Sequence, residues 1–193
     1  YFSFQWHITD ECDQRCKHCY IFSENINKKP DQMSFTQMEE VIANCEDFCA
    51  MYDRRPYFYL TGGDPILHPA FWQLADLLKK KGVPFTIMGN PFHLTDEVCS
   101  RLYDCGCKRY QMSIDGMKDT HDWFRKPGSF SLTLDKITCL NRSGIRSIIM
   151  TTVSGKNIDE VVTDEHQAYQ LIRLAEQFFN ATGGAVTLFS TMT

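Results

Sequence analysis

The stretch Tyr57–Pro65, YFYLTGGDP, decides the fold because an aromatic, apolar run passes directly into a loop of turn residues. Tyr57–Leu60 is typical of a buried strand, and Thr61–Pro65 carries the glycines, aspartate and proline that end such a strand. A helical apolar spacing follows, with Gly82 as a C-terminal cap. The stretch therefore predicts one strand–loop–helix unit. The apolar positions of its helix are Phe71, Leu74, Leu77 and Leu78.

The same unit recurs on both sides of this stretch. Upstream, residues 1–8 alternate apolar and polar side chains as a half-buried strand does, and Ser34 with Gln37 forms a capping box that opens a helix. Downstream, strands are expected at 84–88, 109–115 and 145–153, helices from Thr95 to Gly106 and from Ser131 to Gly144, and then a helix over 164–180 and a strand over 185–191. We expect residues 154–162 to form a flexible loop.

Strict alternation predicts an α/β fold of parallel strands joined by right-handed helical crossovers, either a barrel or an open doubly wound sheet. Of these we predict a partial (β/α)6 TIM-like barrel with outer helices. In both architectures the site lies at the carboxyl ends of the strands.

Composition limits the classes of function. A chain of 193 residues fits one domain, and its formal net charge of −4, with scattered basic residues, argues against nucleic-acid binding. No apolar run is long enough for a membrane span. The chain begins at Tyr1 without a leader, so we expect a piece of a longer protein. Nine cysteines, an odd number in a chain of this length, favour a reducing, cytoplasmic setting over a disulfide lattice.

Three cysteines follow the first strand with the spacing Cys12-x3-Cys16-x2-Cys19. Thiolates on a loop favour zinc or an iron–sulfur centre, and both normally take four ligands. Three protein ligands leave one position open for chemistry. From the spacing alone, three interpretations remain: an iron–sulfur cluster, a zinc site completed by His18 or a remote cysteine, and incidental thiols.

The other cysteines and most histidines have simpler interpretations. Cys45 and Cys49 lie on the apolar stripe of a predicted helix, where free cysteine acts as a small hydrophobe. The spacing of the later cysteines fits no four-thiolate motif, so we expect structural roles for them. We expect the histidines to be surface or hydrogen-bonded groups rather than ligands. These residues are Cys99, Cys105, Cys107, Cys139, His68, His93, His121 and His166.

The cysteine triplet, at this place in an alternating α/β chain, resembles the cluster motif of the radical S-adenosylmethionine enzymes. The resemblance implies that Cys12, Cys16 and Cys19 hold a [4Fe-4S] cluster and leave one iron for the amino and carboxylate groups of S-adenosylmethionine. The loop TGGDP resembles the Gly-Gly-Glu-Pro loop of that family, with Asp64 in place of glutamate. Gly62, Gly63 and Asp64 are thereby implied to meet the amino group of the cofactor, because a carboxylate complements an ammonium.

Segments that follow the later predicted strands also resemble motifs of this family. SIDG (113–116) and HDWFR (121–125) resemble the subgroup with a C-terminal SPASM or twitch domain, which implies that Ser113 and Arg125 contact the ribose and carboxylate of the cofactor. Asn90, in MGNP, stands where relatives show Thr-Asn-Gly. His18 occupies the place of an aromatic residue whose backbone faces the adenine, and Tyr20 follows it as in that subgroup.

The resemblance implies an enzyme in which one electron cleaves S-adenosylmethionine to a 5′-deoxyadenosyl radical that abstracts a substrate hydrogen. The variants are most similar to enzymes that modify or crosslink ribosomally synthesised peptides; related branches mature sulfatases or build cofactors. A peptide or protein substrate and a flavodoxin or ferredoxin electron donor are implied. Residues 1–193 would be the core domain, with auxiliary Fe–S clusters in a C-terminal region beyond it. The alternative from another class is a non-enzymatic zinc or electron-transfer module.

Overall fold

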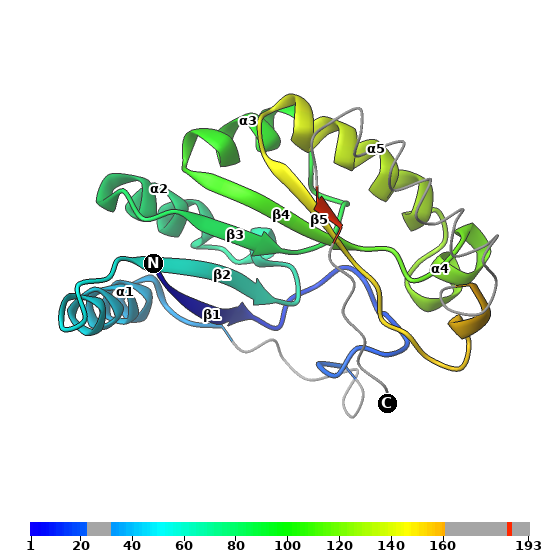
Figure 1. Ribbon diagram of the computed structural model, residues 1–193, viewed down its shortest axis with the longest axis horizontal. Helices are drawn as coiled ribbons and strands as arrows, with labels where there is room; N and C mark the ends of the chain where they lie inside the picture. Colours follow the sequence, from blue (N-terminus) through cyan, green and yellow to red (C-terminus); the bar gives the residue numbers. More distant parts are fainter. Residues whose placement is uncertain (23–31, 161–184, 187–193) are drawn as a thin grey trace.

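The computed structural model describes residues 1–22, 32–160 and 185–186. Within this part of the chain six parallel strands form one sheet, and every strand pairs with its predecessor in sequence (Figure 1). This order has no reversal point, so it is that of a partial barrel and not of a doubly wound sheet. The predicted fold is confirmed. The strands are β1 Phe2–Thr9, β2 Pro56–Gly62, β3 Phe85–Met88, β4 Cys107–Ser113, β5 Arg146–Met150 and β6 Ala185–Val186.

Helices connect the strands and lie around the sheet (Figure 1). The helix predicted over 164–180 lies outside the described residues, and of the strand predicted over 185–191 only 185–186 are described, where Ala185 pairs with Ile148. The helices are α1 Phe35–Ala50, the 3-10 helix η1 Pro65–Leu67, α2 Phe71–Lys81, α3 Asp96–Asp104, α4 Lys118–Phe124 and α5 Ser129–Arg142.

Local capping explains the start of α1, the start of α3 and the end of α2. The capping box at α1 is present, with Gln37 N donating to Ser34 Oγ at 3.3 Å and Ser34 N donating to Gln37 Oε1 at 2.8 Å. Thr95 caps α3. Gly82, at φ +65°, caps the end of α2 in the left-handed region that glycine adopts without strain.

Helix α5 begins two residues before the predicted Ser131, for a non-local reason. The side chain of Asp122, in α4, accepts hydrogen bonds from Gly128 N at 2.8 Å and from Phe130 N at 2.9 Å. This carboxylate satisfies donors at the start of α5 that have no partner inside the helix. The boundary therefore depends on a residue outside the helix.

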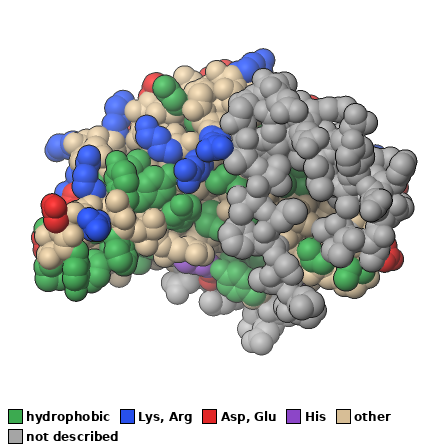
Figure 2. All heavy atoms as spheres, in the orientation of Figure 1, with side chains coloured by type: hydrophobic (Ala, Val, Ile, Leu, Met, Phe, Trp, Pro, Cys, Tyr) green, Lys and Arg blue, Asp and Glu red, His purple; other side chains and the backbone are tan. Residues whose placement is uncertain are grey.

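One face of the sheet forms the core. Phe58, Leu60, Phe85, Ile87 and Tyr110 are fully buried in one hydrophobic cluster with residues of the surrounding helices. Alternate residues point to the opposite face, where those of β2 remain partly exposed and Thr86 of β3 is buried. Figure 2 shows hydrophobic side chains gathered over β2 and β3 on the face viewed.

Helix α4 was not predicted. It has seven residues and no side-chain cap, and it buries His121 and Phe124. Its stability therefore comes from packing rather than from a local signal. Among the described residues, no helix has both the length and the apolar character that crossing a bilayer requires.

Candidate functional site

The residues singled out from the sequence come together at the carboxyl edge of the sheet. We call residues 10–22, which follow β1, the cysteine loop, and residues 62–65, at the end of β2, the GGDP loop. Asn90 follows β3, Ser113 ends β4, and Arg125 follows α4. Figure 1 shows the cysteine loop, in blue, running from β1 past the other strand ends towards α4. Parallel strands bring these loops to one edge, as expected.

The GGDP loop is bonded directly to the cysteine loop and the end of β1. Gly63 N donates to Thr9 O and Asp64 N donates to Glu11 O, both at 2.7 Å. A Cβ on Gly62 would stand 2.1 Å from Thr9 O, and one on Gly63 would stand 2.1 Å from Glu11 O. The two glycines therefore allow one backbone to approach another.

Within the described part of the chain, the Asp64 carboxyl is buried and forms no salt bridge. It is completely buried, and its Oδ1 accepts a long hydrogen bond of 3.4 Å from Ile66 N. Its Oδ2 has no hydrogen-bond partner among the described residues. Burial raises the pKa of this carboxyl to about 7. A Cβ on Gly89 would stand 2.8 Å from Asp64 Oδ1, so the position beside the carboxylate requires glycine. An ammonium group would supply the missing partner.

The three cysteines are half-buried, and donors lie beside the sulfurs of Cys12 and Cys16. Cys12 Sγ accepts from Gln14 N at 3.4 Å and from Asn90 Nδ2 at 3.7 Å. Burial raises the pKa of Cys12 to about 11 and also raises the pKa of Cys16, which the Arg125 charge opposes. Cys12 and Cys16 are therefore thiols in the metal-free loop, and metal binding must release their protons.

The spacing of the ligand atoms distinguishes two kinds of metal site. A tetrahedral zinc with thiolates at about 2.3 Å brings its sulfurs to within about 4 Å of one another. Among the described residues the cysteine sulfurs do not form a group with all ligand atoms within 4.8 Å, whereas Asp13, Asp64 and His93 do. This spacing does not match a single zinc ion held by all three thiolates.

Asp13 and His93 were missed as members of the site. Asp13 Oδ2 lies 3.3 Å from His93 Nε2, and Asp13 Oδ1 accepts from Asn90 Nδ2 at 2.8 Å. The one sequence signal was the position of Asp13 directly after Cys12. His93 lies 80 positions further along, so only the fold brings it here.

Arg125 joins α4 to the cysteine loop. Its Nε donates to Asp115 Oδ2 at 2.5 Å, its Nη1 lies 3.6 Å from Cys16 Sγ, and its Nη2 lies 3.4 Å from His18 Nε2. Asp115 is completely buried, and the Arg125 charge and hydrogen bond keep the pKa of its carboxyl below the usual value in spite of that burial. Asn157, also buried, donates to the Asp115 carbonyl at 2.6 Å. Asn157 belongs to the segment expected to be flexible, whose described part it anchors.

The remaining predicted residues lie at the same edge. Tyr20 Oη is 3.4 Å from His7 Nδ1, and the His18 ring packs against Phe124 with ring centroids 5.2 Å apart. The Asn90 carbonyl accepts from Tyr110 Oη at 3.0 Å. The Ser113 hydroxyl has no hydrogen-bond partner among residues 1–22, 32–160 and 185–186.

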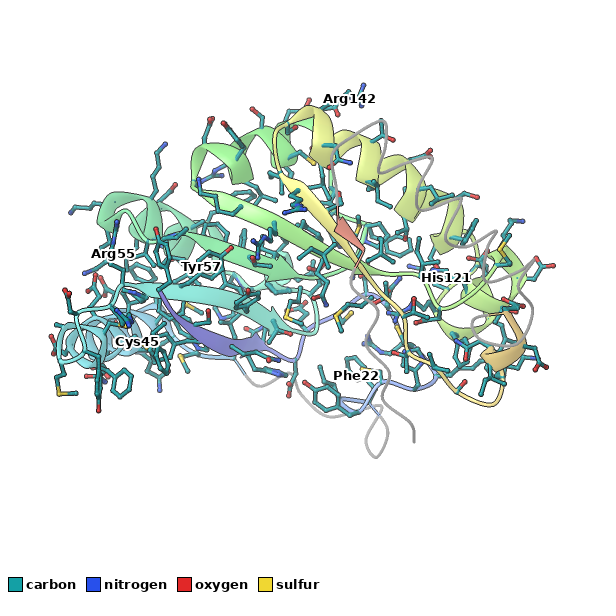
Figure 3. All side chains as sticks on the ribbon, viewed as in Figure 1. Phe22, Cys45, Arg55, Tyr57, His121 and Arg142 are labelled. Atoms are coloured by element: carbon teal, nitrogen blue, oxygen red, sulfur yellow. The ribbon has the colours of Figure 1, made fainter. Side chains whose placement is uncertain are left out.

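The other cysteines lie outside this edge. Cys45, on α1, is far from Phe22 and His121 in Figure 3. Cys99 Sγ and Cys139 Sγ are 3.1 Å apart and buried between α3 and α5. Cys49, Cys105 and Cys107 are also buried, so the structural interpretation of this group agrees with the packing.

Comparison with known proteins identifies the family. The profile of the radical SAM superfamily matches residues 6–167. The chain belongs to the radical SAM superfamily. This family uses a [4Fe-4S] cluster together with S-adenosylmethionine, and the three thiols and the buried Asp64 carboxylate are suitable groups for both.

Relatives of the radical SAM chain have several activities. It is 28% identical over 176 residues to the AdoMet-dependent heme synthase of Methanosarcina barkeri, covering 90% of this chain and 49% of that protein. It is 28% identical over 165 residues to the mycofactocin maturase MftC of Mycobacterium tuberculosis, covering 82% and 40%. The chain therefore spans about half the length, or less, of these curated relatives.

Solved structures of radical SAM proteins share the fold. Streptococcus suis SuiB bound to S-adenosylmethionine superposes with a TM-score of 0.73 at 12% identity, over 97% of this chain and 40% of SuiB. Methylornithine synthase (PylB) gives a TM-score of 0.72 at 13% identity, over 97% and 52%. At these identities the likeness shows the fold alone.

Proposed function

We propose that the chain is the core of a radical SAM enzyme that reductively cleaves S-adenosylmethionine and removes a hydrogen atom from a ribosomally synthesised peptide, which it modifies or crosslinks. The observation that carries the proposal is the buried Asp64 carboxylate, whose Oδ2 has no hydrogen-bond partner within the described part of the chain and whose backbone is bonded to a loop of three cysteines. A structural zinc or electron-transfer module needs no such carboxylate. A site for an amino-acid cofactor does.

Cys12, Cys16 and Cys19 would hold the cluster in this proposal. Asp64 would bind the cofactor ammonium, while Gly62 and Gly63 keep the GGDP loop close enough to the cysteine loop for that contact. When bound, the cluster and S-adenosylmethionine supply the electron and the radical chemistry. The protein chain orients both groups and limits the access of water.

Other residues would bind the rest of the cofactor. The Ser113 hydroxyl can donate to or accept from ribose or carboxylate oxygens. Arg125 uses three of its five N–H donors on Asp115, Cys16 and His18, so it retains donors for a carboxylate. We also assign Asn90, and the backbone from His18 to Tyr20, to the cofactor site.

The peptide substrate is supported by the relatives. One is named as a mycofactocin maturase, and SuiB has been solved bound to a precursor peptide, SuiA. A second candidate is synthesis of a tetrapyrrole cofactor, favoured by the similarity to an AdoMet-dependent heme synthase. For either substrate we propose a flavodoxin or ferredoxin as electron donor.

The test begins with anaerobic reconstitution of the full chain with iron and sulfide, followed by dithionite and S-adenosylmethionine. We expect about four irons per chain in addition to any auxiliary clusters, and formation of 5′-deoxyadenosine. Cys16→Ala should abolish both, whereas Cys49→Ala, which changes a buried thiol on α1, should retain them. A cluster-loaded protein that forms no 5′-deoxyadenosine, or a protein that binds only zinc, would contradict the proposal.

The substrate class requires a second measurement. Deuterium-labelled precursor peptides and iron coproporphyrin are supplied separately, and deuterium in 5′-deoxyadenosine is measured by mass spectrometry. Transfer from a peptide supports the first candidate. Transfer only from the porphyrin supports the second.

A further inference from the structure

A buried ion pair lies beside one of the three cysteines. Arg125 Nε donates to Asp115 Oδ2 at 2.5 Å, and Arg125 Nη1 lies 3.6 Å from Cys16 Sγ. The Arg125 side chain is only 14% exposed, and that of Asp115 is fully buried. Lys17 N donates to Phe124 O at 2.8 Å, which ties the backbone of the cysteine loop to the end of α4. Arginine keeps its proton in proteins, so a permanent positive charge faces this sulfur.

Hydrogen bonds from three segments fix the ion pair. Asp115 Oδ1 accepts from Thr152 N at 3.0 Å, and Asp115 O accepts from Asn157 Nδ2 at 2.6 Å. Asp115 N donates to His121 Nδ1 at 3.2 Å. Each of these partners is buried or half-buried, so water screens the pair poorly. The carboxylate is held in place, and it holds the guanidinium against Cys16.

Charges and donors at a ligand sulfur act on the electron affinity of an iron–sulfur cluster. Hydrogen bonds to the sulfurs and the net charge nearby are among the factors that set its reduction potential. A cation stabilises the reduced form, which carries one more negative charge, and an anion destabilises it. Arg125 therefore raises the reduction potential of a nearby cluster, and Asp115 lowers it.

We propose that Arg125 and Asp115 set the reduction potential of the cluster at Cys12, Cys16 and Cys19, Arg125 raising it and Asp115 limiting the rise. This inference rests on the proposed function, because it requires a cluster at these cysteines. Both are positioning residues that act through the Cys16 sulfur. The role differs from cofactor binding because it is present before S-adenosylmethionine is added.

The experiment is a redox titration of the reconstituted full chain, followed by electron paramagnetic resonance without S-adenosylmethionine. In Arg125→Gln we expect the reduction equilibrium to become at least tenfold less favourable, which is about 59 mV for one electron. In Asp115→Asn, which retains an acceptor for Thr152 N, we expect a shift in the opposite direction. Arg101→Gln is the matched control, because Arg101 lies on α3 and pairs with Asp76 at the surface. It should leave the potential unchanged.

Opposite shifts distinguish this role from a merely structural one, because loss of packing would not change sign between the two variants. If Arg125→Gln fails to take up iron, Arg125→Lys and Asp115→Asn decide the question. The lysine variant keeps the charge and should titrate close to the wild type, whereas Asp115→Asn should titrate at a higher potential. A cluster-loaded Arg125→Gln or Asp115→Asn variant that titrates like the wild type, or a shift of both in the same direction, would overturn the inference. A wild-type chain without a cluster would instead contradict the proposed function.

Discussion

Replacing Gly63 by alanine should detach the GGDP loop from the cysteine loop. The new Cβ would stand 2.1 Å from Glu11 O and 2.8 Å from Asp10 O, and both are backbone atoms that cannot rotate away. The loops must separate, which weakens the hydrogen bonds from Gly63 N to Thr9 O and from Asp64 N to Glu11 O. Each such bond contributes about 0.5–1.5 kcal/mol, and overpacking costs about 1–3 kcal/mol. We expect a loss of about 3 kcal/mol in the free energy of unfolding.

Urea unfolding and thermal melting measure this loss. For a chain of this size about 3 kcal/mol corresponds to a fall of about 6–12 °C in Tm. Gly155→Ala is the matched control, since a Cβ there meets nothing within 4 Å. It should change stability by no more than about 0.5 kcal/mol. Iron uptake should fall in Gly63→Ala and stay normal in the control. A Gly63→Ala variant as stable as the control, with full iron uptake, would refute the steric argument.

Three further variants test the buried polar groups. Burial raises the pKa of Asp64 to about 7, so its stabilising contribution is complete below about pH 4 and is lost as the pH rises to 7. In the wild type the free energy of unfolding should fall over this pH range by on the order of 4 kcal/mol at most. Urea unfolding of the metal-free Asp64→Asn variant should not show this fall. Burial lowers the pKa of His121 to about 4, so its contribution is present above pH 6.5 and is lost as the pH falls. The stability of His121→Asn should therefore fall less in acid than that of the wild type. If the free energy of unfolding of Asp64→Asn or His121→Asn depends on pH as in the wild type, the pKa shift given for that residue is wrong. Asn157→Ala removes the hydrogen bonds to Asp115 O and Thr152 O and should lower the free energy of unfolding by about 3 kcal/mol in the same assay. A loss below about 0.5 kcal/mol would show that these hydrogen bonds do not stabilise the fold.

The parts of the fold that were predicted depend on local signals. The capping box at Ser34, the Thr95 cap and the glycine after α2 each lie within a few residues of the boundary they set. The strand order follows from the strict alternation of strands and helices and from right-handed crossovers. Helix α4 and the start of α5 escaped prediction because Asp122 and buried aromatic residues, rather than local caps, determine them.

In the candidate site, too, contiguous motifs could be predicted and long-range contacts could not. The cysteine spacing and the GGDP loop are contiguous motifs, so the sequence displays them directly. The glycines were expected to let the backbone approach a ligand, whereas in the structure their nearest neighbours are Thr9 O and Glu11 O. Contacts of Arg125 with Cys16, and of His93 with Asp13, join residues that are far apart in sequence. No local pattern contains this information.

The contacts of the cysteine loop with the ends of β2, β3 and α4 have a consequence for biogenesis. A nascent chain exposes all three thiols once residue 19 has left the ribosome, but the partners of Cys12 and Cys16 extend to Asn90 and Arg125. Iron delivered earlier in translation would meet a cysteine loop without these contacts. A cluster that depends on the contacts can therefore form only after translation has passed the end of α4.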